Sequence, residues 1–330
     1  MAEAIKDLEY FPSIAARQLK SNASNTISLH LIIPADGVIQ HSTWSFFFPI
    51  IQGFVSSAKK AQFRAHLEFN TPEELSDFSS IQSFVVGHQL AGSAFVILHA
   101  GDYSSLVRLA RIGRRVVTVY SKVDDSVASI CTNNMRESQS VVQWLRKLGH
   151  KHVGFVNGVE WHTASLERKA GYEAGMVGTG YKKIYPGDWT IRSGIAALKY
   201  FIALDKPPTA IFCANDHMAI GVIKACQVLR IRIPEDISLV GFDDNFVSQV
   251  TEPRLTSVRM PLTKMGEAAA LALIRSSGTK GSLSEAHQVF PSRMILRNSA
   301  IARLRKRMSG SANFKGAIHN DGKPRKRRTS

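Results

Sequence analysis

Short apolar runs alternate with segments of helical periodicity along most of the chain. Runs of strand length occupy residues 26–34, 65–69, 94–98, 115–120, 153–156, 183–185, 210–214 and 237–242. Apolar residues recur at helical spacing in segments 50–61, 135–148, 190–204, 217–229 and 264–276. Strands that alternate with helices run parallel and are joined by right-handed crossovers. We therefore expect an α/β fold built on parallel sheets.

Polar residues directly follow two of these apolar runs. Asn215 and Asp216 follow the run at 210–214, and Asp243 and Asp244 end the run at 237–242. The carboxyl ends of parallel strands are where open α/β sheets bind ligands. The alternative is helix capping, because Asp and Asn are favoured at helix N-termini. Capping weighs more for Asp216 and Asp244, so Asn215 and Asp243 are the stronger candidates for ligand contacts.

Length and composition bound the class of protein. The chain has 330 residues, of which 44% are hydrophobic, and this suffices for two lobes that each bury a core. No apolar run reaches the ~18 residues that a membrane helix needs. The N-terminus carries acids and has no apolar stretch of the kind that a secretory signal contains. The three cysteines are too few and odd in number for a disulfide framework. We expect a cytoplasmic protein that does not enter a membrane.

The charge is strongly basic and unevenly distributed. The net charge is +16, and a balance of this kind favours a polyanionic partner. Residues 300–330 hold ten Lys and Arg against one acid, so they contribute nine of the sixteen charges. This segment has no apolar period, and we interpret it as a disordered basic extension. Two roles are open for it, which are non-specific phosphate contact and simple solubilisation.

Signatures of enzymes are missing from the sequence. It contains no Walker loop, no His-Glu-x-x-His and no Gly-x-Ser-x-Gly motif. Gly178-Thr-Gly180 lacks the third glycine of a dinucleotide fingerprint. His41, His88, His99 and His217 are scattered without the spacing of metal ligands. We expect no catalytic activity, no cofactor and no metal.

Four motifs follow one another between residues 214 and 256. They are Ala214-Asn-Asp-x-Met-Ala-x-Gly221, Ile233-Pro-Glu-Asp-Ile-Ser, Val240-Gly-Phe-Asp-Asp244 and Pro253-x-Leu-Thr256. In order and spacing they resemble the lactose/galactose-repressor (LacI/GalR) family of bacterial transcription regulators. The resemblance covers nearly the whole chain except its tail. It implies two doubly wound parallel-sheet lobes, similar to the type I periplasmic binding proteins, that are joined by three crossings of the chain and enclose a ligand cleft.

The resemblance also implies a division of the chain and a function. Residues 26–130 with 260–286 would form the N-terminal lobe, and residues 131–259 with 287–300 the C-terminal lobe. Residues 301–330 would be the tail. The implied protein is a cytoplasmic homodimeric repressor that binds DNA and responds to a small molecule, possibly a sugar. The alternatives are the solute receptor of a sugar transporter and a ligand sensor that no longer reads DNA.

Six residues match positions that contact the ligand in this family. They are Phe46, Phe47, Arg168, Trp189, Asn215 and Asp243. An arginine can hold paired oxygens bidentately, and an aromatic face suits the apolar face of a sugar or a base. The alternatives are core packing for the phenylalanines, a solvated helix face for Arg168 and a half-buried anchor for Trp189. Tyr120 stands where the family often has an acid, which leaves the ligand class open.

The N-terminal residues resemble the end of a helix-turn-helix domain followed by a hinge helix. The matching residues are Leu8-x-Tyr10-x-Pro12-Ser13-x-x-Ala16-Arg17-x-Leu19. Residues 1–11 would be what remains of the helix-turn-helix domain, and residues 12–25 the hinge helix and linker. The resemblance implies that Leu19 wedges into the DNA minor groove while Arg17 and Lys20 face phosphates. The alternative is a linker helix packed on the body. A start upstream of Met1 and a loss of specific DNA readout both remain open.

Overall fold

The computed structural model describes residues 24–34, 39, 41–276 and 287–303, and they fall into two compact units. Of the described residues, unit 1 comprises those up to Thr132 and those within Pro261–Pro291, and unit 2 comprises Asn133–Met260 and those from Ser292 onward. The chain therefore passes between the units three times. Residues 1–23, which include the predicted hinge residues Arg17, Leu19 and Lys20, lie outside the described residues, as does most of the predicted tail.

Unit 1 is built on a six-stranded parallel sheet with the order β11-β5-β4-β3-β1-β2. The strands are β1 (Thr26–Ile32), β2 (Arg64–Asn70), β3 (Gly92–Val96), β4 (Val116–Tyr120), β5 (Ala128–Cys131) and β11 (His287–Val289). The inner strands β1, β3 and β4 are buried along nearly their whole length. A strand that helices cover on both faces needs such a continuous apolar run.

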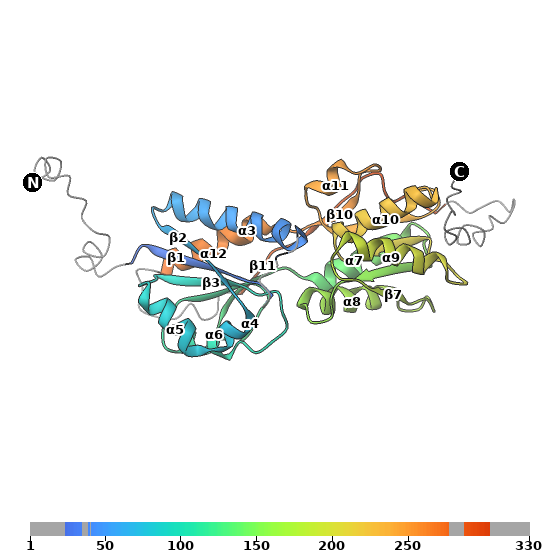
Figure 1. The fold of residues 1–330 in the computed structure, drawn as a ribbon. Helices are drawn as coiled ribbons and strands as arrows, with labels where there is room; N and C mark the ends of the chain where they lie inside the picture. The colour runs from blue at the N-terminus through green and yellow to red at the C-terminus, as the bar shows by residue number, and fades with distance from the viewer. Residues whose placement is uncertain (1–23, 35–38, 40, 277–286, 304–330) are drawn as a thin grey trace, which may run out of the picture. The chain divides into compact units, whose positions relative to one another are not determined.

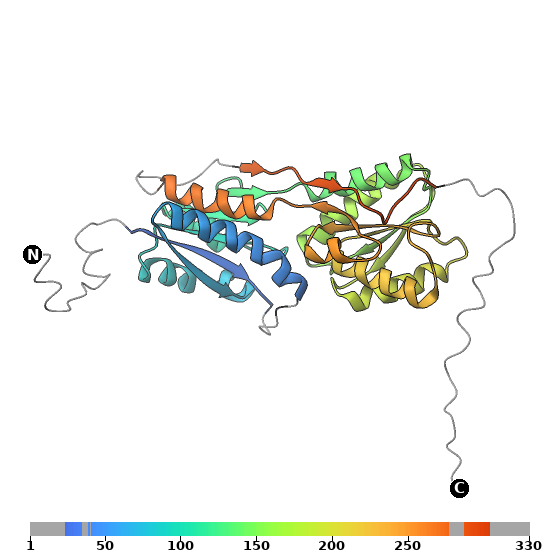
Figure 2. The ribbon, with the colours of Figure 1, turned by 90° about the horizontal axis from the view of Figure 1, so that it is seen from above.

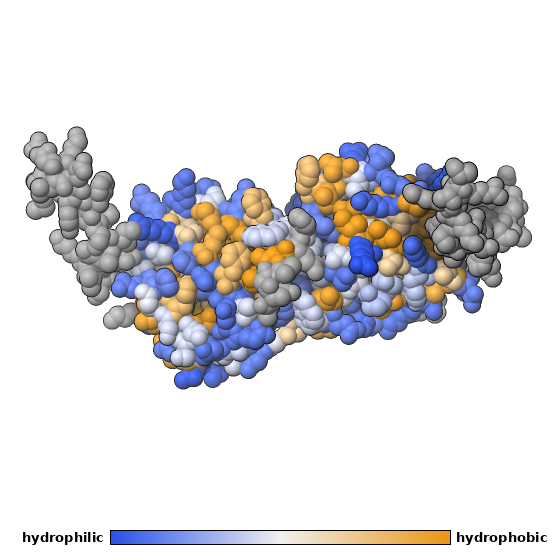
Figure 3. Space-filling view, in the orientation of Figure 1, coloured by the Kyte–Doolittle hydropathy of each residue, from blue (hydrophilic) through white to orange (hydrophobic). Residues whose placement is uncertain are grey.

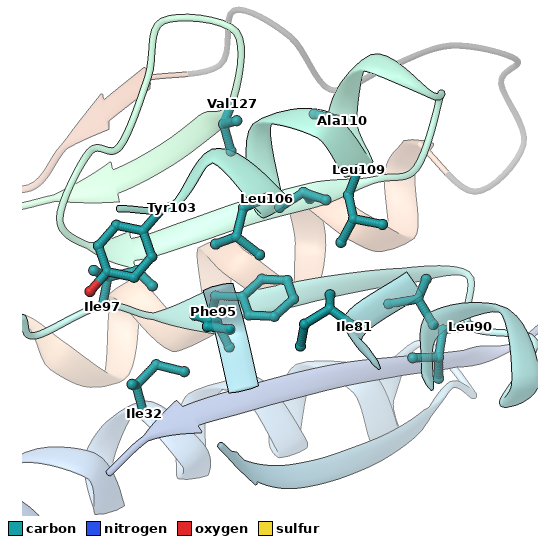
Figure 4. Packing of buried hydrophobic residues seen from close by; sticks show 13 residues of the cluster. Ile32, Ile81, Leu90, Phe95, Ile97, Tyr103, Leu106, Leu109, Ala110 and Val127 are labelled. Carbon is teal, nitrogen blue, oxygen red and sulfur yellow. The ribbon is translucent and has the colours of Figure 1, made fainter. Parts of the chain in front are cut away.

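Helices cover the sheet of unit 1 on both faces. On one side α3 (His41–Lys60) packs against α12 (Leu262–Arg275), which contacts β3 and β4. On the other side lie α4 (Pro72–Ser76), α5 (Phe78–Gly87) and α6 (Ser104–Arg111), as Figure 1 shows. Figure 4 shows the core beneath these three short helices, where Phe95 of β3 meets Ile81 of α5 and Leu106 and Leu109 of α6.

The helix predicted at 50–61 begins nine residues earlier than its pattern indicated. It starts at His41 and contains Pro49. Proline lacks an N–H and usually ends a helix. Here Phe47, Ile50 and Phe54 are completely buried at helical spacing on both sides of the proline. The apolar face is therefore continuous through Pro49, and packing of this face outweighs the lost hydrogen bond.

Unit 2 repeats the architecture with the strand order β12-β10-β9-β8-β6-β7. Its strands are β6 (Val153–Asn157), β7 (Lys183–Pro186), β8 (Ala210–Cys213), β9 (Ser238–Asp243), β10 (Thr256–Arg259) and β12 (Arg293–Ile295). All are parallel except β12, which pairs antiparallel with β10. Two such sheets agree with the predicted fold class of two doubly wound lobes, which is confirmed.

The helices of unit 2 form two packed pairs on opposite faces of its sheet. One pair is α7 (Asn134–Lys147) with α8 (Thr163–Met176), and the other is α9 (Ile191–Ile202) with α10 (Asp216–Leu229). In Figure 2 the green α7 and the yellow α10 lie on either side of the sheet. A Cβ added at Gly171 of α8 would come within 2.1 Å of the Met135 carbonyl oxygen of α7. Glycine at this position lets α8 lie close enough to α7 to bury Arg168 one turn earlier.

One closing strand belongs to a different unit than the sequence suggested. The prediction assigned residues 287–300 to the C-terminal lobe. In the structure β11 pairs parallel with β5 in the sheet of unit 1, and only β12 joins unit 2. Two three-residue strands separated by a short connection give no pattern that distinguishes one sheet from another.

Candidate functional site

The carboxyl ends of β6, β8 and β9 lie side by side in unit 2. The chain runs from β6 to β7 on one side and later adds β8 and β9 on the other, so the strand order reverses between β6 and β8. A reversal of this kind opens a crevice at the carboxyl ends of the two strands, and ligands of open α/β sheets bind there. Four of the six predicted ligand residues, Arg168, Trp189, Asn215 and Asp243, are in this unit.

Arg168 of α8 is almost completely buried, with 2% of its surface exposed. Its Nε donates to Asn134 Oδ1 at 2.9 Å, and its Nη1 donates to the carbonyl oxygen of Ala214 at the end of β8. The guanidinium also lies 3.6 Å from the centre of the Phe242 ring. Burial on this scale excludes the alternative of a solvated helix face. The guanidinium instead links α8 to the ends of β8 and β9.

Asp243 ends β9 beside this arginine. One carboxylate oxygen lies 3.6 Å from Arg168 Nη1, and 17% of the side chain stays exposed. Burial raises the pKa of the Asp243 carboxyl to about 7, although the positive charge of Arg168 acts in the opposite direction. A carboxyl group with this pKa changes its protonation state near neutral pH. It can accept hydrogen bonds from hydroxyl groups when it is ionised.

Asn215 follows β8 and caps α10. Its Oδ1 accepts from Met218 N at 2.9 Å, and its Nδ2 donates to the carbonyl oxygen of Trp189 at 3.0 Å. Capping was the alternative that weighed less for this residue, and the structure shows that Asn215 does cap the helix. The amide therefore has a structural role in holding Trp189. Contact between Asn215 and a ligand stays a prediction.

Trp189 follows β7, and its ring packs against residues from other segments of unit 2. A Cβ added at Gly158 would fall 2.0 Å from the Trp189 ring, so only glycine allows the ring to lie there. The His162 ring meets Trp189 edge to face at 5.0 Å. The indole Nε1 is buried without a hydrogen-bond acceptor among the described residues. A buried donor without a partner costs free energy that an acceptor on a ligand could recover.

Two further aspartates, Asp216 and Asp244, form contacts that hold the backbone at the end of β9. Asp216 is fully buried and accepts from Ser257 Oγ at 2.6 Å and from Asn245 N at 2.9 Å. Burial, and then the charge of Asp243, raise the pKa of Asp216 well above its ordinary value. Asp244 forms ion pairs at 2.6 Å with Arg259 Nε and with Arg297 Nη1. These contacts fix the backbone around Asp243. The two arginines could not be predicted as partners of Asp244, because they are distant from it in the chain.

Backbone strain is concentrated at the ends of strands. Seven non-glycine residues in the described part of the chain have positive φ. Gln62, Gln89 and Arg230 follow helices, where a left-handed residue commonly ends the helix. The other four lie at or just after the carboxyl ends of strands, and they are Tyr120, Trp189, Asp243 and Asp244. Strain of this kind persists only where the surroundings enforce it, and it clusters at functional sites.

The two predicted aromatic contacts belong to unit 1 and differ from each other. Phe47 is completely buried in the core, which agrees with the alternative of core packing. Phe46 is half-buried, and its ring meets that of Tyr120 edge to face at 4.8 Å. Tyr120 ends β4 with φ +82°. Of the two phenylalanines, Phe46 is thus the one beside a strand end, and its contact with a ligand stays a prediction.

Comparison with known proteins shows which proteins this chain resembles. Residues 142–300 match the model of the periplasmic binding protein-like domain. The chain is 29% identical over 286 residues to the "Probable HTH-type transcriptional repressor ExuR" of Bacillus subtilis, covering 84% of this chain and 83% of that protein. It is 26% identical to the HTH-type transcriptional repressor PurR of Klebsiella pneumoniae, covering 90% of this chain and 86% of the repressor. The chain is therefore similar over most of its length to HTH-type transcription repressors.

Solved structures of transcription regulators have the same fold. The Escherichia coli transcriptional repressor ascG superposes with a TM-score of 0.72 at 22% identity, covering 84% of this chain and 99% of that one. A LacI family regulator from Enterococcus faecium with bound ribose gives 0.67 at 18% identity, covering 83% and 99%. The curated relatives are transcription repressors rather than enzymes, and the expectation that this chain is not an enzyme is confirmed by them.

The described residues contain neither a helix that could span a membrane nor a group of side chains arranged to hold a metal ion. None of the helices between residues 41 and 275 is long and apolar enough to cross a membrane. Across residues 24–34, 39, 41–276 and 287–303, no group of His, Cys, Asp and Glu is arranged to hold a metal ion.

Proposed function

We propose that this protein is a transcription regulator whose affinity for DNA is controlled by a small, neutral polyhydroxy molecule bound in unit 2. The observation that carries the proposal is the meeting of Asp243, Trp189 and Arg168 at the strand ends, with both Asp243 and Trp189 in strained backbone conformations. The kinship with repressors supports the regulatory role.

The contacts of these side chains favour a neutral ligand. The cation of Arg168 is already engaged by Asn134, by the Ala214 carbonyl and by the neighbouring carboxyl of Asp243. An anionic ligand would therefore meet the partly exposed Asp243 rather than a free positive charge. Hydroxyl groups can donate to Asp243, and an apolar ring face can stack on Trp189. The ribose bound by the Enterococcus regulator is a molecule of this class.

The proposed mechanism is an equilibrium between two states of the protein. One state binds DNA through the predicted hinge residues Arg17, Leu19 and Lys20, and the other does not. A ligand shifts such an equilibrium only by the difference between its affinities for the two states. The effector must therefore make contacts at the strand ends that differ between the states.

The test begins with thermal shifts of the full chain against neutral pentoses and hexoses, hexuronates and purine bases. We expect a neutral sugar to raise the melting temperature. That sugar should also change the affinity for a duplex selected by this protein from random sequences, and Leu19→Ala should weaken duplex binding without changing the thermal shift. Stabilisation by a sugar without binding to any selected duplex would favour a solute receptor and contradict the regulator.

We further propose that the protein acts as a homodimer through a patch on unit 2. The patch comprises Val228 of α10 and both end residues of the short helix α11 (Phe246–Val250). Val228, Phe246 and Val250 are 80%, 74% and 61% exposed. Figure 3 shows hydrophobic surface over α10 and α11. Exposed apolar residues that gather in this way mark surfaces for association.

Phe246→Glu is expected to convert the dimer into a monomer of about 36.4 kDa, because it buries a charge in the apolar contact. Sedimentation equilibrium at micromolar concentration measures the mass. Val177→Glu is the matched control, since Val177 is 72% exposed in the same unit but outside the patch. A dimeric mass retained by Phe246→Glu would move the interface elsewhere.

A further inference from the structure

Unit 2 is strongly basic at the amino ends of its parallel strands, which is the end opposite the candidate site. Arg146 and Lys147 end α7, Lys151 and Lys206 stand on the loops before β6 and β8, and Arg303 follows Ser299. All five residues are exposed. We refer to these five residues as the amino-edge face, because they lie at the amino ends of the parallel strands. The candidate site lies at the carboxyl ends of the same strands.

The loops that carry these charges are tied together. Arg303 N donates to the Leu148 carbonyl at 2.8 Å, and His150 bonds the Ile301 carbonyl through Nε2 at 3.0 Å and Thr209 Oγ1 through Nδ1 at 3.0 Å. The hydrogen bonds join the loop before β6, the loop before β8 and the C-terminal segment. The charges therefore stand on a fixed support and need little ordering to meet a partner.

The same region packs an aromatic pair between two of the basic residues. The His152 ring stacks on Tyr181 at 4.5 Å, and Tyr181 Oη donates to the Lys206 carbonyl at 3.2 Å. Burial and then the charges of Arg303 and Lys206 lower the pKa of His152, so both cations lie close to one histidine. His152 is consequently neutral at physiological pH, and the face gains its charge from Lys and Arg alone.

Acids do not neutralise the face. Among the residues that the structure describes, no carboxylate forms an ion pair with Arg146, Lys147, Lys151, Lys206 or Arg303. Asp205, which precedes Lys206, is exposed, and Glu173 and Asp236 pair with Lys182 and Arg232 at 2.7 Å. The chain then continues from Arg303 into residues 304–330, which hold nine more Lys and Arg against one Asp.

We propose that the amino-edge face binds the phosphate backbone of duplex DNA without regard to sequence, as a second DNA contact separate from the hinge. Fixed positive charges that lack acidic partners are complementary to a polyanion. Each phosphate neutralised releases counterions, so binding of this kind weakens steeply with salt. The face lies at the amino ends of the strands, whereas Asp243 and Trp189 lie at the carboxyl ends. DNA bound to the face therefore leaves the ligand residues uncovered.

The test is a charge reversal of the full-length chain. Lys147→Glu, Lys151→Glu and Lys206→Glu are combined, and Lys60→Glu, Arg111→Glu and Lys264→Glu in unit 1 form the matched control with the same change in net charge. Fluorescence anisotropy measures binding to a 30-base-pair duplex of random sequence across a series of salt concentrations. Circular dichroism and melting temperature check that both variants are folded.

We expect the face variant to lose at least about tenfold in affinity for the random duplex and to reduce the slope of log K against log salt by about 2 to 3. The control variant should change the slope by less than 1. Equal losses in the two variants would reduce the effect to net charge and overturn the proposal. So would a loss confined to single-stranded RNA of the same length. The effector sugar should raise the melting temperature of the face variant as much as that of the wild type, which separates this result from failure of the proposed effector site.

Discussion

Replacing Asp243 by asparagine is expected to weaken binding of the effector by about 10- to 100-fold, because a hydrogen bond to a charged acceptor contributes about 1.5–3 kcal/mol. Asparagine keeps the size of the side chain and removes only its charge. Isothermal titration of the wild type and the variant with the sugar found in the thermal screen measures the loss. Gln143→Glu, a charge change at an exposed position of α7, is the control.

The same variant tests the protonation of Asp243. In the free protein the pKa of about 7 lies above the ordinary value of 3.8, so the carboxyl is mostly protonated between these two pH values. A ligand that donates hydroxyl hydrogen bonds to the carboxylate favours the ionised form. Binding should therefore release a proton and strengthen as the pH rises, by up to about tenfold per pH unit below 7. Equal pH dependence in the wild type and in Asp243→Asn would contradict this assignment.

The raised pKa of Asp243 has the opposite effect on the stability of the unliganded protein, because this stability decreases as the pH rises. Because the folded-state pKa of Asp243 is raised, this residue favours the folded state most below pH 4 and loses that contribution as the pH rises to about 7. The Asp243→Asn variant has no carboxyl group at this position, so its stability does not decrease in this way as the pH rises. The variant should consequently gain stability relative to the wild type between pH 5 and pH 8.

Replacing Arg168 by methionine is expected to lower the free energy of unfolding by about 2–4 kcal/mol, since two buried acceptors would each lose a charged donor. The acceptors are Asn134 Oδ1 and the Ala214 carbonyl oxygen. Urea unfolding at pH 8 followed by tryptophan fluorescence measures the change. Arg192→Met, at an exposed position of α9, should change it by less than about 0.5 kcal/mol.

The loss in Arg168→Met should be smaller at pH 5 than at pH 8. Removal of the arginine leaves Asp243 with burial as the main influence on its carboxyl, and protonation at low pH then relieves the uncompensated charge. A loss that is the same at both pH values would show that Asp243 and Arg168 do not interact. A stable variant that still binds the effector would remove Arg168 from its positioning role.

Most of the fold followed from the periodicity of the sequence, and the exceptions have physical causes. Long buried strands such as β4 and β9 give clear apolar runs. The short β5 and α11 are missing from the predictions because four or five residues show too little periodicity. The start of α3 was wrong because Pro49 obscured an apolar face that continues on both sides of it.

The sequence pattern located some residues of the candidate site, but it did not reveal the partners that hold them in place. Asp243, Asn215 and Trp189 stand at strand ends, which the sequence pattern locates. The partners that fix them are remote in the chain, as Arg297 is from Asp244 and Asn134 is from Arg168. Such contacts leave no local signal. The family resemblance supplied Arg168, because a lone arginine on a helix is ordinarily solvated.

The chain passes between the units three times, and each unit is therefore completed only late in synthesis. Unit 1 is completed by α12 and β11, and unit 2 by β12 and by Ser299, whose hydroxyl donates to the Leu239 carbonyl at 2.7 Å and accepts from Thr256 N. A ribosome that has delivered the first 250 residues has therefore finished neither unit. Both cores stay incomplete until nearly the last residues emerge, so the nascent chain depends on protection from aggregation for almost the whole of its synthesis.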